Sequence, residues 1–156
     1  MKRRRILGIP LSEWGWALAW SALILGLTSL PYIGAALYQN AEFRFGGLVY
    51  DVGDIYTYLA EMRQGAGGSW LLHLPFTSED HPRALIHPLY LLLGKVGAAA
   101  GLPHLATFHL ARLAGGLALL LAVYMFISHF TPHRPVRRLA FLFAGLSSGL
   151  GWLILL

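Results

Sequence analysis

The sequence predicts an all-α integral membrane protein, and three observations support that prediction. Only 12% of the 156 residues are charged, which is about half the share found in an ordinary soluble domain. The mean hydropathy is positive, at +0.58. Residues 14–36 form an uncharged apolar run, and a run of about 23 residues is long enough to cross a hydrocarbon core of ~30 Å.

The basic residues predict a membrane orientation and argue against nucleic-acid binding. The formal net charge is +5, but Lys and Arg gather in two short clusters, residues 2–5 and 134–138, each beside an apolar run. Such clusters mark the cytoplasmic side of a membrane protein. We therefore expect an inner (plasma) membrane location with a cytoplasmic N-terminus over residues 1–13. The chain has no cysteine, so disulfides and thiol chemistry are excluded.

The first apolar run could also belong to a secretory signal peptide, because basic residues precede it. Residues 14–36 are longer than a signal h-region and carry no convincing small-x-small cleavage site. Aromatic side chains lie near both ends of the run, as in the belts of membrane helices: Trp14, Trp16, Trp20, Tyr32 and Tyr38. A first transmembrane helix over 14–36 is therefore favoured.

Residues 37–104 form the predicted outer loop, which holds most of the acidic residues. Within it, residues 54–64 have a helical pattern, with one apolar stripe made of Ile55, Tyr58, Leu59 and Met62. The polar residues expected to face away from that stripe are Asp54, Thr57, Glu61 and Gln64. A short amphipathic helix of this kind is expected to lie along the membrane surface.

The rest of the chain predicts two further crossings. Residues 87–100 are apolar but short and contain Lys95, so they predict an interfacial or partly inserted helix. Residues 105–130 predict the second crossing, 131–138 a basic cytoplasmic loop, and 139–156 a third crossing in which the chain stops. With 87–100 as a full span the second basic cluster would lie outside, so the charge rule favours three crossings.

The outer loop also carries the first candidate for chemistry. Asp51 and Asp54 follow the first crossing and stand at the head of the predicted surface helix. A carboxylate there could act as a general base at the lipid–water boundary. The alternative is structural, because Asp is a favoured N-cap residue and stabilises the first turn of a helix.

Two other groups of polar residues leave alternatives open. One is a polar group around residues 73–87 that could hold a hard cation or zinc, or could simply be a polar loop: His73, Glu79, Asp80, His81, Arg83 and His87. Its spacing matches no standard metal motif. The other is Arg112, about two turns into an apolar helix, which could bind a lipid phosphate or extend to the headgroups.

These residues together resemble the GT-C membrane glycosyltransferases, above all the family 39 type (protein mannosyltransferase-like and aminoarabinose transferase-like). Asp54 with Tyr58 four residues on, followed by Gly68-Ser69-Trp70, is similar to the family's first outer loop. The segment from His87 to Tyr90 (HPLY) resembles the family's Pro-Pro-Leu-Tyr with its preceding His or Lys. Arg112 stands where the family often has an Arg at the start of its second crossing.

The resemblance implies a fold and an activity. The fold would be the N-terminal part of a GT-C module, with three transmembrane helices and one or two interfacial helices in the first outer loop. The activity would be transfer of a sugar from a polyprenyl-phosphate-linked donor to an acceptor on the outer face. The chain departs from the family pattern at Ile55, where a second acid is common, and by having one Pro after His87.

The resemblance also implies roles for individual residues. Asp54 would be the general base, with Asp51 as a substitute for the missing acid, and Tyr58 would line the site. His87 would bind substrate, and the candidates for the donor phosphate are Arg63, Arg83 and Arg112. A divalent metal remains an open alternative, with no ligand set assigned.

The expected partners are the lipid-linked donor, membrane lipid, and the rest of the same polypeptide or a part encoded downstream. The chain alone is expected to be inactive. The competing hypothesis is a non-catalytic membrane subunit or a transporter fragment. Transporters place charges near the membrane midplane, whereas six of the seven acidic residues here lie in one outer loop, which favours the enzyme.

Overall fold

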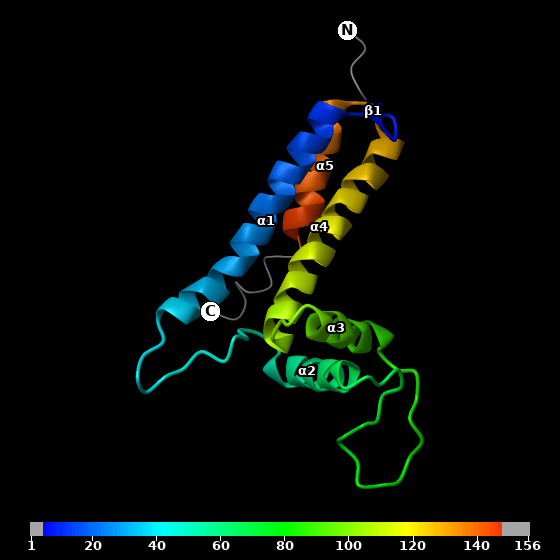
Figure 1. The fold of residues 1–156 in the computed structure, drawn as a ribbon. Helices are drawn as coiled ribbons and strands as arrows, with labels where there is room; N and C mark the ends of the chain where they lie inside the picture. The colour runs from blue at the N-terminus through cyan, green and yellow to red at the C-terminus, as the bar shows by residue number, and fades with distance from the viewer. Residues whose placement is uncertain (1–4, 148–156) are drawn as a thin grey trace. The chain divides into compact units, whose positions relative to one another are not determined.

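The computed structural model describes residues 5–147, which are mostly helical (Figure 1). A small hairpin comes first, with strand β1 (Arg5–Ile6) antiparallel to β2 (Ile9–Pro10). Leu7 and Gly8 connect the strands, and both have positive φ angles of 51° and 77°. Two successive residues with positive φ form the tight turn that suits a two-residue hairpin.

Five helices follow in the described residues. They are α1 (Leu11–Leu37), α2 (Val52–Ala66), α3 (Pro88–Ala99), α4 (His104–Phe130) and α5 (Arg134–Leu146). The helices expected over 54–64, 87–100 and 105–130 are therefore present at nearly those bounds. The chain divides into two compact units, one formed by residues up to Leu30 and from Leu113 on, the other by Pro31–Arg112.

Within residues 5–147, the helices α1 and α4 are long and apolar enough to cross a membrane. Little of their apolar surface is covered by other described residues, because only 17% of the most apolar window of α1 and 6% of that of α4 are buried. The core helix of a soluble protein would be mostly buried. Leucines such as Leu23, Leu27 and Leu119 are instead about half exposed or more, and a large exposed apolar surface marks a site of contact with lipid or protein.

The first unit is held together by aromatic packing near the start of α1. Its core contains Ala17 and Ile24 from α1, Tyr124 from α4 and Phe141 from α5. Trp16 packs its ring against the rings of Tyr124 and Phe141, with centroid distances of 6.0 and 5.8 Å. Trp16, predicted to belong to an interfacial belt, therefore also joins three helices.

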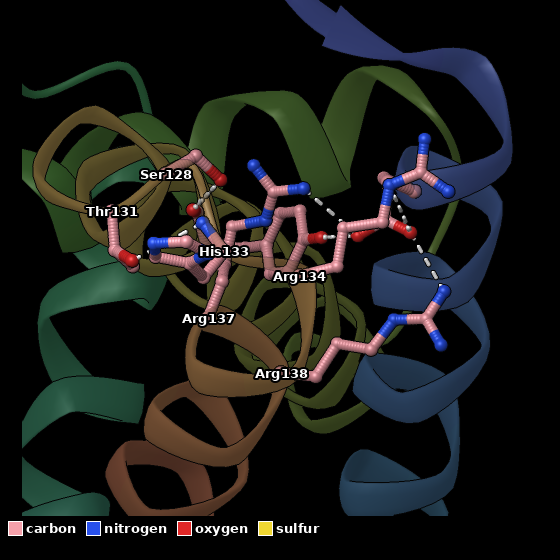
Figure 2. Close-up of polar contacts among 8 residues, drawn as sticks. Ser128, Thr131, His133, Arg134, Arg137 and Arg138 are labelled. Carbon is pink, nitrogen blue, oxygen red and sulfur yellow. Dashed lines mark hydrogen bonds and ion pairs between the residues drawn. The ribbon is translucent and has the colours of Figure 1, made fainter.

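The same region contains a buried carboxylate that the sequence interpretation overlooked. Glu13 lies in the first turn of α1 and is fully buried. Its Oε2 accepts hydrogen bonds from the Tyr124 hydroxyl at 2.6 Å and from Arg137 Nη2 at 3.0 Å, while Oε1 accepts one from Arg138 Nη2 at 2.7 Å. Arg134 Nε lies 3.9 Å from Oε1. The guanidinium groups converge from the first turns of α5 (Figure 2).

This network corrects two predicted boundaries. The segment expected as a basic loop over 131–138 is helical from Arg134, because Pro135 suits the first turn of a helix and Glu13 neutralises part of the arginine charge. The helix α1 starts at Leu11 rather than Trp14, because its one carboxylate, Glu13, is paired with these arginines. Of the third crossing expected over 139–156, α5 describes the part up to Leu146, and residues 148–156 lie outside the described part.

Candidate functional site

The second unit brings the proposed chemistry together on the helix pair α2 and α3, which lie side by side (Figure 1). Asp51 occupies the N-cap position of α2 but has a left-handed backbone, with φ 50°, and its side chain makes no capping hydrogen bond. Asp54 lies in the first turn and is exposed. The side chain of Asp51 is therefore not used as a cap, and Asp54 contributes only its charge to the helix start.

One face of α2 carries three side chains whose chemistry suits catalysis or binding. Asp54, Tyr58 and Glu61 follow at i, i+4 and i+7, a spacing that places them in one narrow sector of a helix. Asp54 is the outermost of the three, Tyr58 is half-buried and Glu61 is buried, with 3% of its surface exposed. The face thus runs from an accessible carboxylate to a covered one.

The start of α3 supplies the groups that cover this face. His87 Nδ1 lies 2.8 Å from Glu61 Oε1. The ring of Tyr90 stacks on that of Tyr58, with centroids 4.2 Å apart and planes 6° from parallel, and the ring of His87 meets both edge-on. Burial, with smaller contributions from Tyr58 and Glu61, raises the pKa of the Tyr90 phenol. Tyr90 therefore keeps its proton as a donor over a wide pH range.

Glu61 corrects the sequence interpretation, which placed it on the solvent side of α2. A hydrogen bond to an ionised carboxylate requires the proton on Nδ1, and in that tautomer Nε2 of His87 is left for other contacts. The His87 side chain is 51% exposed, whereas that of Glu61 is 4% exposed. Glu61 Oε2 is buried and has no hydrogen-bond partner in the described residues. The sequence feature that links Glu61 to the candidate site is its position seven residues after Asp54, which places both carboxylates on one face of α2.

Two glycines allow α2 and α3 to approach this closely. A Cβ atom on Gly65 would collide with the backbone carbonyl of Leu91, and one on Gly94 would collide with that of Met62. Met62 and Leu91 are themselves fully or almost fully buried between the helices. The apolar stripe predicted for membrane contact therefore packs, at its Met62 end, against α3.

Gly94→Ala is expected to destabilise the helix pair by about 1–3 kcal/mol, the usual cost of forcing extra volume into a packed contact. Amide hydrogen exchange across α2 and α3 should accelerate, and the midpoint of thermal unfolding should fall. Gly115→Ala is the matched control, because nothing lies within 4 Å of the added methyl group. Equal behaviour of the two variants would contradict the close α2–α3 contact.

The three arginines proposed for phosphate binding make other contacts. Arg63 is exposed and lies on the side of α2 opposite Asp54. Arg83 donates a hydrogen bond to Ser69 Oγ at 2.9 Å. The Arg112 guanidinium lies 4.7 Å from the ring centroid of Tyr32. None of these contacts is with Tyr58, Glu61 or His87, whereas the rings of Tyr58 and His87 meet with centroids 6.2 Å apart.

Within the polar group around residues 73–87, His81 contacts the backbone. The His81 ring nitrogens contact the carbonyl oxygens of Pro82 and Leu74, and its ring packs against that of His73. Across residues 5–147 there is no cluster of three or more His, Asp or Glu side chains that could hold a metal ion. His87, counted with this group in the sequence, pairs with Glu61 instead.

Comparison with known proteins adds no relative. No protein-family model, no curated protein and no solved structure matches this chain.

Proposed function

We propose that this chain forms the N-terminal part of a membrane glycosyltransferase, which moves a sugar from a polyprenyl-phosphate donor to an acceptor hydroxyl on the outer face. One observation carries the proposal: Asp54, Tyr58 and Glu61 share a face of α2, and His87 and Tyr90 of α3 cover part of the same face. An accessible carboxylate beside aromatic rings and an oriented imidazole suits binding and activation of a sugar.

The mechanism assigns Asp54 as the general base. Its carboxylate takes the proton from the acceptor hydroxyl while the acceptor oxygen bonds to the anomeric carbon of the donor. The bond between that carbon and the phosphate oxygen breaks, and polyprenyl phosphate leaves with the electron pair. Tyr58 and Tyr90 offer an aromatic surface at the site, and His87 Nε2, oriented by Glu61, is available to the departing phosphate.

The proposed orientation rests on the charge distribution and on the first unit. Glu13 at the start of α1 accepts hydrogen bonds from Arg137 and Arg138 at the start of α5, so these two helix starts lie close together. The chain between them contains two candidate crossings, α1 and α4, and two crossings return a chain to the side from which it began. The basic residues are concentrated beside those two ends in the sequence, which predicts that both face the cytoplasm. Residues 38–103 then lie on the outer side, where a lipid-linked donor presents its sugar.

Sealed vesicles that carry the complete protein test the activity and its side of the membrane together. A panel of polyprenyl-phosphate hexoses and pentoses with short, water-soluble chains is added outside, and release of polyprenyl phosphate is measured. We expect turnover in right-side-out vesicles and little turnover in sealed inverted ones. Turnover only in inverted vesicles would reverse the orientation, and no turnover with any donor in detergent-opened vesicles would contradict the transferase.

A further inference from the structure

The first unit has a strong excess of positive charge that its own residues cannot neutralise. Residues 1–30 and 113–156 contain seven Lys or Arg residues and a single acidic residue, Glu13. Three of the cations, Arg134, Arg137 and Arg138, lie within 4 Å of that one carboxylate. Coulombic repulsion among three guanidinium groups is only partly offset by one negative charge, so a further anion would stabilise this region.

A groove with the right chemistry opens beside these arginines. It has a volume of about 1070 Å³ and lies between the β1–β2 hairpin, the last turns of α4 and the start of α5. Arg134, Arg137 and His129 line it. The rest is largely apolar, including Ile9, Val123 and Phe126. A groove lined by both cationic and apolar side chains matches an amphipathic anion better than a small soluble one.

An unpaired donor atom of Arg137 is the second feature that favours a ligand in this groove. Its side chain is 7% exposed, and Nη2 is used by Glu13. Its Nε is buried and has no hydrogen-bond partner in the described residues, and a buried donor left unpaired costs free energy. Arg137 also lines the groove. Arg134 and Arg137, both labelled in Figure 2, contact Glu13 at 3.9 and 3.0 Å.

We infer that this groove binds an anionic phospholipid of the adjacent leaflet. The phosphate contacts Arg134 and Arg137, and the acyl chains follow the apolar wall along Val123 and Phe126. Basic pockets next to membrane helices on the cytoplasmic side suit anionic headgroups in this way. The inference does not depend on the glycosyltransferase proposal, because it uses only residues of the first unit.

Native mass spectrometry of the purified full chain tests the site, with phosphatidylglycerol and phosphatidylcholine of identical acyl chains as probes. We expect phosphatidylglycerol to bind at least tenfold more tightly. Arg134→Gln should weaken phosphatidylglycerol binding about fivefold, which corresponds to loss of one basic contact worth about 1 kcal/mol. Arg134 is chosen because its side chain is 46% exposed and its ion pair with Glu13 is long, at 3.9 Å, so the fold should survive its loss.

Three controls separate the alternatives. Arg44→Gln removes the same charge from an exposed position in the second unit and should leave binding unchanged; an equal loss there would mean unspecific charge attraction. Ala122→Trp fills the groove without changing charge and should also weaken binding. Displacement of the lipid by millimolar inorganic phosphate would show a free-anion site instead, and equal affinity for both lipids would overturn the anionic-lipid site.

Discussion

Asp54→Asn is expected to lower sugar transfer by about 10²–10⁴-fold in the complete protein, because it removes the proposed general base. The structural cost should be small. Asp54 is exposed and lies in the first turn of α2, where loss of a negative charge costs about 0.3–1 kcal/mol through the helix dipole. Release of polyprenyl phosphate and thermal unfolding are measured on the same preparation, so chemistry and folding are separated.

Asp51→Asn is the matched control for this prediction. Asp51 has a positive φ angle of 50°, and Asn tolerates that left-handed conformation well. We expect a smaller loss of turnover than for Asp54→Asn. An inactive Asp51→Asn beside an active Asp54→Asn would move the base to Asp51, and full activity in both variants would remove the catalytic role of this loop.

Glu13→Ala is expected to be the most destabilising substitution in the described chain. It would leave Arg137 buried, with Arg134 and Arg138 close by, and without the one carboxylate that they share. Breaking a buried ion pair by removing one partner costs about 3–5 kcal/mol. The Tyr124 hydroxyl also loses its acceptor. The loss can be measured as a fall in the unfolding midpoint by near-ultraviolet circular dichroism, because Trp16 and Tyr124 share this core.

Two companion variants sharpen this test. Ser12→Ala changes an exposed neighbour on α1 and should melt like the wild type. Arg138→Gln removes one cation but leaves Glu13 paired with Tyr124 and Arg137, so it should cost less than Glu13→Ala. A Glu13→Ala variant with the wild-type midpoint would show that the arginine network does not hold α5 to α1 and α4.

The sequence alone determined where the helices lie and which of them could cross a membrane. Long apolar runs and periodic stripes are local properties, so the expected helices over 54–64, 87–100 and 105–130 recur as α2, α3 and α4 within a few residues. Helix starts were less predictable. α1 begins before Trp14, and α5 before residue 139, because the charges that would have excluded Glu13 and Arg137 from a buried helix neutralise each other.

Only the tertiary structure decided which polar residues meet. Glu61 and His87 are 26 positions apart, and Glu13 and Arg138 are 125 apart, so no local pattern could pair them. Periodicity placed Glu61 on the solvent side of α2, yet the close approach of α3 at Gly65 and Gly94 buried it. A helix face is polar or apolar by sequence, but whether it is covered depends on the neighbouring helix, and that contact exists only in the folded chain.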